Sequence, residues 1–341
     1  MRILGIDTSC DDTSAAVVED GRRMLSNVVS SQNDIHLKFS GIVPELASRK
    51  HIEMIWPVVR EALDSAGSEI SDLDAIAVCK GPGLIGSLLV GCSFAKSLSY
   101  ASGIPLLGIN HLEGHIYSNF LEAESPDFPF LALVVSGGHT SLFNVKGPGI
   151  YCEVARTLDD AAGEAYDKVA KLLGVGFPGG PVIDKLSRRG DPTKVNFPRP
   201  YLRGKSDFSF SGLKTAVLYH YNKYPDTPVE EIAAGFQASV IDVLVKKTLD
   251  EALRLNLKAV VLSGGVSANS ELRERILNKA SEEGIRVFLP SVELCTDNAA
   301  MIAAAGRHHL IAGDIAPMDL SPKAYLPLDK RACEVVEQSY R

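Results

Sequence analysis

The sequence predicts an α/β protein made of two related halves. Its 341 residues are 45% hydrophobic and 23% charged, which is ordinary for a globular protein, and this length favours two domains. Short apolar runs alternate with longer segments of helical spacing. One pattern occurs twice, at residues 2–18 and 130–145: an apolar strand, a polar turn, and a Thr-Ser pair that opens a return strand. Such a repeat indicates a duplicated supersecondary unit.

The first half opens with three strands joined by tight turns, and Asp20-Gly21 is a hairpin signal between the second and the third. Residues 44–66 have helical spacing, but we expect a break at Trp56-Pro57 because proline removes a helical hydrogen bond. The expected elements are strands at 2–6, 13–18, 24–29, 75–78 and 105–109, helices at 44–66 and 84–100, and a helix that begins at the histidines described below.

The second half carries a helical insertion after its first hairpin. A Gly/Pro-rich stretch, 174–181, follows the inserted helix, and we expect irregular chain from there to about Lys205. The expected elements are strands at 130–135, 142–145, 259–262 and 286–289, and helices at 158–173, from 207, at 228–255, 269–280 and 299–306.

Two histidines, His111 and His115, open a helix directly after the apolar run 105–109. Positions i and i+4 share one helix face, so both imidazoles can reach one point, as a metal ion requires. The peptidase motif H-E-x-x-H has the same spacing but needs a glutamate after the first histidine, where this chain has Leu112. Glu113 falls on the far side of the helix. The spacing alone leaves two interpretations open: metal ligands, or two unrelated surface or capping histidines.

Glycine-rich turns follow two of the predicted strands, as Ser136-Gly137-Gly138 and Ser263-Gly264-Gly265. Glycine lets backbone N–H groups approach an anion closely, although most Gly-Gly turns only turn the chain. Together with the polar turn Asp7-Thr8-Ser9, they describe a nucleotide or phosphate held between two domains. The sequence contains no Walker A motif, and we interpret the formal Rossmann match at 81–86 as chain turning and helix packing.

Bulk properties exclude several classes of protein. The N-terminal residues lack a signal-peptide pattern, and no run approaches the roughly 18 apolar residues of a membrane span. The six cysteines form no C-x-x-C pair, which favours free thiols in a cytoplasmic protein without a membrane segment. A net charge of −7 argues against a general nucleic-acid-coating surface, so any such contact needs a local basic patch.

Motifs in order across nearly the whole chain resemble one family, the bacterial TsaD (YgjD/Gcp) branch of the tRNA threonylcarbamoyl-adenosine proteins. The motifs are IDTSCDDT (6–13), GPGL (81–84), NHLEGH (110–115), VSGGHT (135–140), FPGGP (177–181), FSFSGLKT (208–215) and SGGVSAN (263–269). The resemblance implies an α/β, actin-like fold (sugar kinase/Hsp70/actin, or ASKHA) of two duplicated domains with helical insertions. We expect an N-terminal domain at 1–115 with a C-terminal return at about 300–327, a second domain at 116–299 with an insertion at about 158–225, and a tail at 328–341.

The resemblance also implies an acyltransferase. The expected reaction moves the threonylcarbamoyl group from threonylcarbamoyl-AMP to N6 of the adenosine 3′ of the anticodon, in tRNAs that read ANN codons. It further implies a TsaB-like paralogue and a TsaE-like ATPase as partners. Other interpretations remain open at this point: a metallopeptidase, which the His-x-x-x-His spacing alone suggests, a kinase or ATPase of the same fold, and a non-catalytic nucleotide-binding scaffold of that fold.

Site residues follow by motif from the same resemblance. It implies His111, His115 and Asp297 as ligands of one divalent metal. Two histidines and one carboxylate with open positions suit Fe²⁺, and Zn²⁺ is the alternative. Capping of the last helix is the structural alternative for Asp297. Asp11, Asp12 and Glu113 are left open as proton acceptors. The implied substrate-binding residues are Val134, Val135, Ser136, Gly137, Gly138, Asp167, Gly180, Asp184 and Asn269.

A basic stretch in the insertion is the candidate tRNA surface, with Arg199, Arg203 and Lys205 as its principal residues. Phe197 and Tyr201 are interleaved with them, as base stacking would need. Such clusters are often only solvated surface. A second candidate is Arg49-Lys50-His51.

Overall fold

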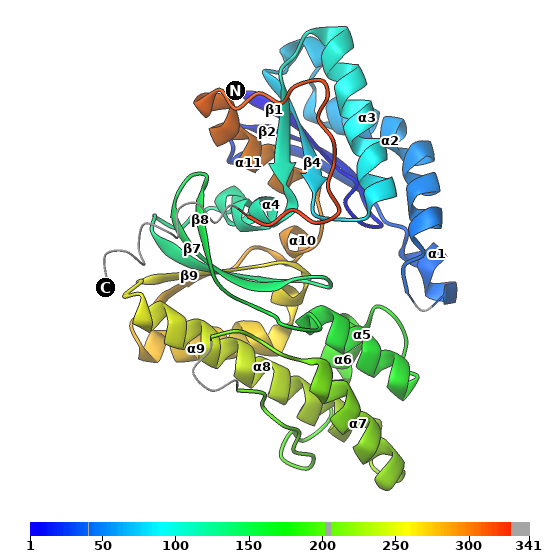
Figure 1. Ribbon diagram of the computed structural model, residues 1–341, viewed down its shortest axis with the longest axis vertical. Helices are drawn as coiled ribbons and strands as arrows, with labels where there is room; N and C mark the ends of the chain where they lie inside the picture. Colours follow the sequence, from blue (N-terminus) through cyan, green and yellow to red (C-terminus); the bar gives the residue numbers. More distant parts are fainter. Residues whose placement is uncertain (40, 202–205, 329–341) are drawn as a thin grey trace. The chain divides into compact units, whose positions relative to one another are not determined.

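The structure, a computed structural model, describes residues 1–39, 41–201 and 206–328. They form two compact units (Figure 1). Unit 1 contains Met1–Pro126, the hairpin tip Gly147–Tyr151 and the described residues from Pro290 onward, and unit 2 contains Asp127–Lys146 and Cys152–Leu289. Residues 290–299, which we expected in the second domain, pack in unit 1. Asp297 therefore belongs to the same unit as the two histidines.

Unit 1 is built on a five-stranded mixed sheet in the order β3-β2-β1-β4-β5. β1 pairs antiparallel with β2 and parallel with β4, and β4 pairs parallel with β5. Its strands are β1 (Arg2–Asp7), β2 (Thr13–Glu19), β3 (Arg23–Ser30), β4 (Ala75–Gly81) and β5 (Leu106–Asn110), and its helices are α1 (Asn33–His36), α2 (Pro44–Ala66), α3 (Ile85–Ser102), α4 (His111–Tyr117), α10 (Val292–Cys295) and α11 (Ala299–Ala312).

Both faces of this sheet are covered, which explains why its inner strands β1 and β4 and the neighbouring β5 are largely apolar and buried. Helices α2 and α3 cover one face, where Leu4 and Ile6 join their core, and α11 lies on the other (Figure 1). α11 approaches β1 closely because Gly5 has no side chain: a Cβ there would stand 2.2 Å from the carbonyl oxygen of Ala299. This close approach fixes the start of α11, next to Asp297.

α2 is one continuous helix from Pro44 to Ala66, with Pro57 inside it. The expected break at Trp56-Pro57 is therefore wrong. Its buried side chains, including Ile55, Val58 and Leu63, continue on both sides of the proline and pack into the core. Burial of this stripe outweighs the loss of one backbone hydrogen bond.

Unit 2 repeats the sheet of unit 1. Its order is β10-β9-β6-β7-β8, with β6 antiparallel to β7, β6 parallel to β9, and β9 parallel to β10. β6 thus takes the place of β1 and β9 that of β4, which confirms the expected duplicated α/β architecture. The strands are β6 (Phe130–Val135), β7 (Thr140–Gly147), β8 (Ile150–Arg156), β9 (Ala259–Ser263) and β10 (Arg286–Phe288).

The helices of unit 2 pack on one face of its sheet, where Leu131, Leu133 and Leu262 join a core with α5, α8 and α9. α6 was not expected, since its residues were predicted to be irregular. The helix begins with Gly-Gly-Pro, a sequence typical of irregular chain, and it buries Ile183 in this core. The helices are α5 (Ala162–Leu173), α6 (Gly179–Ser187), α7 (Ser211–Lys223), α8 (Val229–Arg254) and α9 (Ser270–Glu282).

Among the described residues, no helix is long and apolar enough to cross a membrane. Cys10, Cys79, Cys92 and Cys295 are free thiols, whereas Cys152 is disulfide-bonded, contrary to the expectation of free thiols throughout. The principal basic residues Arg203 and Lys205 lie outside the described residues, as does the tail beyond residue 328.

Candidate functional site

The two histidines stand on α4, which begins where β5 ends. The side chain of Asn110 accepts a hydrogen bond from the backbone N–H of Leu112 at 2.9 Å and so caps the helix. Every residue of α4 is buried. The rings of His111 and His115 lie on one face, with centroids 4.6 Å apart. The helical spacing predicted from the sequence is confirmed.

Asp297 joins these histidines. Its Oδ1 lies 3.4 Å from His111 Nε2 and 3.3 Å from His115 Nε2. α4 and α11 come close at Gly114, where a Cβ would stand 2.9 Å from Cδ1 of Ile302. The cap of α11 is Asn298, whose side chain accepts from the N–H of Met301 at 3.1 Å, so Asp297 does not serve as that cap. The structural alternative for Asp297 is therefore contradicted.

These three side chains fit a divalent cation. Ligand atoms about 2.1 Å from a tetrahedral metal are roughly 3.4 Å apart, and the separations found here are 3.3 and 3.4 Å. Both ring nitrogens of His115 are buried without a hydrogen-bond partner. Buried polar atoms rarely lack partners, so the group has the features of a metal centre.

The charges of the group are strongly coupled. Burial alone would lower the pKa of His111, but Asp297, Asp7 and Cys79 outweigh it and raise that pKa well above its ordinary value. Burial would raise the pKa of Asp297, yet the two imidazoles hold it well below its usual range. Burial lowers the pKa of His115. One carboxylate facing one protonated and one neutral imidazole is the arrangement that a cation would replace.

Two further residues lie beside His111 at the ends of neighbouring strands. Oδ2 of Asp7 lies 3.4 Å from His111 Nδ1, while its Oδ1 accepts from the N–H of Ser9 at 2.8 Å. Cys79 lies in the same group. Because β1, β4 and β5 are parallel neighbours, Asp7, Cys79 and His111 meet at one edge of the sheet. The sequence predicts no role for Cys79 and indicates only a polar turn at Asp7; both residues lie at or near a strand end.

The candidate proton acceptors differ in their surroundings. Glu113 is buried and accepts a hydrogen bond from Tyr151 at 2.7 Å; the imidazoles of His308 and His309 outweigh burial and hold its pKa far below the ordinary range. It therefore cannot act as the base of a metallopeptidase at His111. Burial raises the pKa of Asp12 to about 7, which suits acid–base chemistry near neutral pH.

The substrate-binding candidates lie in unit 2. The parallel pairing of Val134 with Ser263 puts both Ser-Gly-Gly turns at the same end of neighbouring strands. A Cβ on Gly264, whose φ is +89°, would stand 2.4 Å from the Val135 carbonyl oxygen, so this glycine is needed for packing. Gly137 and Gly138 are exposed, and a Cβ on either would meet nothing within 4 Å. That loop is open to a ligand, whereas Val134 and Val135 are buried in β6.

The remaining candidates form a polar network. The carboxylate of Asp184 accepts from Ser270 Oγ at 2.8 Å and from Gln237 Nε2 at 3.2 Å, and Asn269 Nδ2 donates to Gln237 Oε1 at 2.7 Å. Gln237 was missed; a glutamine within the apolar helix α8 was the available signal. Separately, Asp167 accepts from the N–H of Gly179, next to Gly180, at 2.7 Å.

The described basic residues are largely engaged. Arg199 donates to Asp242 at 3.0 Å, and Phe197 is buried and cannot stack on a base. His51 is fully buried and bonds to Thr13 at 2.7 Å, which contradicts its place in the second candidate patch. Tyr201 remains exposed.

Solved structures of low sequence identity share the fold. HypF from T. kodakarensis aligns with a TM-score of 0.63 at 15% identity, over 91% of this chain and 48% of that one. Component A of (R)-2-hydroxyglutaryl-CoA dehydratase from Acidaminococcus fermentans aligns with a TM-score of 0.55 at 14% identity, over 91% and 99%. Together with the two matching sheets, these likenesses confirm the actin-like α/β fold.

Relatives of much higher identity carry one name. A protein from Thermodesulfovibrio yellowstonii is 59% identical over 96% of this chain and 100% of its own length, and one from Trichlorobacter lovleyi is 53% identical over 97% and 98%; both are named tRNA N6-adenosine threonylcarbamoyltransferase. The sequence model of the family TsaD, described by the same words, matches residues 23–304. The chain belongs to the TsaD family of tRNA N6-adenosine threonylcarbamoyltransferases.

Proposed function

We propose that the protein transfers the threonylcarbamoyl group of threonylcarbamoyl-AMP to N6 of the adenosine 3′ of the anticodon in tRNAs that read ANN codons. The observation that carries this function is 59% identity, over the full length of the relative, to a tRNA N6-adenosine threonylcarbamoyltransferase. The metallopeptidase alternative is not favoured, because position 112 is leucine and the carboxylate of Glu113 accepts a hydrogen bond from Tyr151. The presence of a candidate metal centre also disfavours a non-catalytic scaffold.

In this proposal unit 1 holds one divalent cation through His111, His115 and Asp297. Two imidazoles and one carboxylate suit Fe²⁺, and Zn²⁺ is the alternative. When bound, the cation supplies Lewis-acid polarisation and a template for the phosphate or carbamoyl oxygens. Asp7 keeps the His111 ring oriented, because its carboxylate lies beside the nitrogen that faces away from Asp297.

Unit 2 binds threonylcarbamoyl-AMP through its glycine-rich loop and its polar network. Gly137 and Gly138, the exposed residues of the Ser136-Gly137-Gly138 loop, would present backbone N–H groups to a carboxylate or phosphate. Asp167, Gly180, Asp184 and Asn269 would contact the nucleotide and threonyl parts. The N6 amine is a weak nucleophile, so orientation of the two substrates supplies much of the rate. Asp12 is the group whose pKa best suits removal of the N6 proton.

The test is transfer by the purified protein. Threonylcarbamoyl-AMP and an unmodified transcript of an ANN-reading tRNA are supplied, with and without a TsaB-like paralogue and a TsaE-like ATPase, which we propose as partners in the cytoplasm. Mass spectrometry of the nucleosides should show threonylcarbamoyl-adenosine, and mass spectrometry of nuclease fragments should place it at the adenosine 3′ of the anticodon. Its absence under every combination, while bound metal and folding are intact, would contradict the function.

A further inference from the structure

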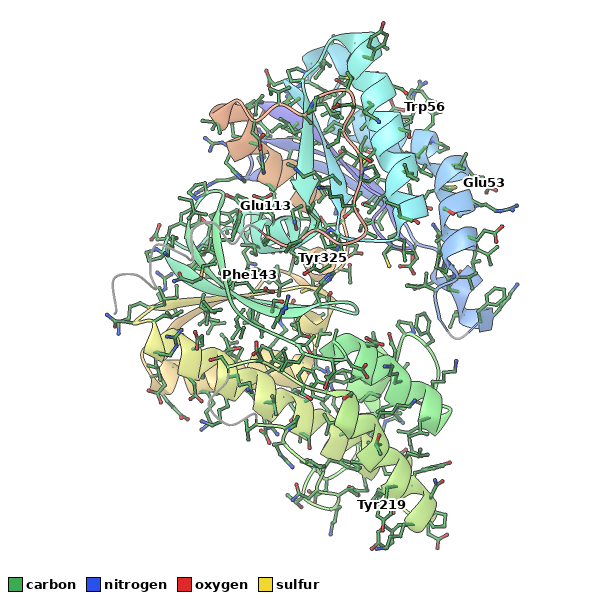
Figure 2. The ribbon with its side chains drawn as sticks, in the orientation of Figure 1. Glu53, Trp56, Glu113, Phe143, Tyr219 and Tyr325 are labelled. Carbon is green, nitrogen blue, oxygen red and sulfur yellow. The ribbon has the colours of Figure 1, made fainter. Side chains whose placement is uncertain are left out.

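A second group of potential ligands lies on the other side of α4. Glu113, midway between His111 and His115, meets two adjacent histidines of α11 (Glu113 is labelled in Figure 2). His308 Nε2 lies 3.1 Å from Glu113 Oε1, and His309 Nε2 lies 3.0 Å from Glu113 Oε2. All these residues belong to unit 1. None of them is used by the proposed reaction.

The contact between His308 and Glu113 is not a hydrogen bond. Both ring nitrogens of His308 are buried without a hydrogen-bond partner, although Nε2 lies so close to the carboxylate. The same oxygen of Glu113 already accepts from Tyr151 at 2.7 Å. A nitrogen and a carboxylate oxygen at this distance, without a hydrogen bond directed between them, leave a polar contact unsatisfied. A bound cation would give His308 Nε2 the partner that it lacks.

The ring orientations also suit ligation. Nδ1 of His309 lies 2.7 Å from Oδ2 of Asp314, so its Nε2 is directed at Glu113. A carboxylate on the outer nitrogen of a histidine is the usual support of a metal ligand. The His308 ring stacks on Tyr117, with centroids 5.0 Å apart, which restrains its rotation. The separations of 3.0 and 3.1 Å between ligand atoms correspond to an angle of about 90–95° at an ion about 2.1 Å away, which is close to octahedral coordination.

We propose that Glu113, His308 and His309 bind a second divalent transition-metal cation, separate from the centre at His111, His115 and Asp297. One carboxylate and two imidazoles select a first-row ion such as Zn²⁺ or Co²⁺ rather than Mg²⁺ or Ca²⁺. Such an ion joins α4 to α11. Because α4 also carries His111 and His115, the second ion stabilises the helix on which the first centre is built.

The experiment isolates the second site with a variant that lacks the first. Full-length His111→Ala/His115→Ala protein is equilibrated with Zn²⁺ and then desalted. We expect one zinc per chain by elemental analysis, and a higher melting temperature with Zn²⁺ than without it. Adding His308→Gln and His309→Gln should abolish both effects. His220→Gln, which changes a histidine of α7 in unit 2, is the matched control and should preserve them.

Two outcomes would overturn the proposal. One is no zinc on the His111→Ala/His115→Ala protein, which would leave Glu113 and the histidines as an ion-paired cluster only. The other is zinc retained after both glutamine substitutions. Circular dichroism in zinc-free buffer checks folding. If the glutamine variants unfold, Asp314→Asn decides, because it keeps all three ligands and should weaken zinc binding about 10-fold or more.

Discussion

Oδ2 of Asp7, at the end of β1, lies 3.4 Å from Nδ1 of His111, at the start of α4. The opposite nitrogen of that ring faces Asp297 at 3.4 Å. One imidazole is thus flanked by two carboxylates, one in the place of a fellow ligand and one in the place of an outer support. We therefore expect substitution of the two aspartates to affect metal binding to different degrees.

Asp7→Asn should reduce metal affinity about 10- to 100-fold without abolishing binding. The amide keeps the size of the side chain and its turn contact but loses the charge that orients the histidine and raises its basicity. Equilibrium dialysis with Fe²⁺ or Zn²⁺ measures the change. Asp34→Asn, at an exposed acid in α1, is the control and should bind as the unchanged protein does. If Asp7→Asn binds the metal as tightly as the unchanged protein does, Asp7 does not support His111 as a ligand.

Asp297→Asn should abolish metal binding at that centre and threonylcarbamoyl transfer, because a neutral amide is a poor ligand. The melting temperature of the metal-free protein should change little, since Asn298 caps α11. His111→Ala and His115→Ala should likewise lose the metal and the activity.

Asn298→Ala tests the helix cap separately from the proposed metal ligand Asp297. It should cost about 1 kcal/mol of stability through the missing cap while keeping the metal. Metal content and calorimetric melting distinguish the two positions. Full metal occupancy and full activity in Asp297→Asn would refute the three-ligand centre.

Gly137→Ala should raise the KM for threonylcarbamoyl-AMP several-fold with little effect on stability. The added methyl group meets nothing in the protein, but it stands in the loop proposed to bind the substrate. Gly264→Ala should instead destabilise the fold by more than about 1 kcal/mol, because of its φ and its approach to Val135. Gly212→Ala, with equally open space on α7, is the control for the substitution itself. An unchanged KM in Gly137→Ala would mean that this loop does not bind threonylcarbamoyl-AMP.

Charge reversal at Arg199 and Arg203 should weaken tRNA binding and reduce its salt dependence, while metal content stays unchanged. The slope of log affinity against log salt should fall by about 0.7–0.9 for each phosphate that the protein no longer neutralises. Filter binding at several salt concentrations measures this. Because Arg199 pairs with Asp242, Asp242→Asn is the control: it removes this ion pair and keeps the charge of the guanidinium. Equal affinity in all three proteins would mean that this stretch does not contact tRNA.

Asp12→Asn should stabilise the metal-free protein increasingly as pH rises. Burial raises the pKa of Asp12 from 3.8 to about 7, so the folded state holds the proton more tightly than the unfolded state. Protonated Asp12 contributes fully to the free energy of unfolding below about pH 4. This contribution is lost as the pH rises through about 7, by up to about 4 kcal/mol. Urea unfolding of both proteins at pH 5 and pH 8 measures the difference. A difference that does not vary with pH would contradict the shifted pKa.

Local patterns in the sequence determined the class of the fold and paired two of the three candidate metal ligands. Apolar runs and helical spacing predicted the strands other than β8, the major helices and the duplication, because periodicity is a property of neighbouring residues. The i, i+4 spacing placed His111 and His115 on one face for the same reason. The family motifs added Asp297, which no local pattern connects to α4.

Tertiary packing decided the rest. Close approaches at Gly5 and Gly114 bring α11 to β1 and α4, and they put Asp297 beside the histidines and His308 and His309 beside Glu113. Pro57 stays inside a helix because the core buries residues on both sides of it. Such packing joins residues far apart in the chain, and its free energy depends on surfaces that exist only once the units have folded. The sequence by itself therefore determined which ligand types the chain carries, and only the folded structure decided which of them meet.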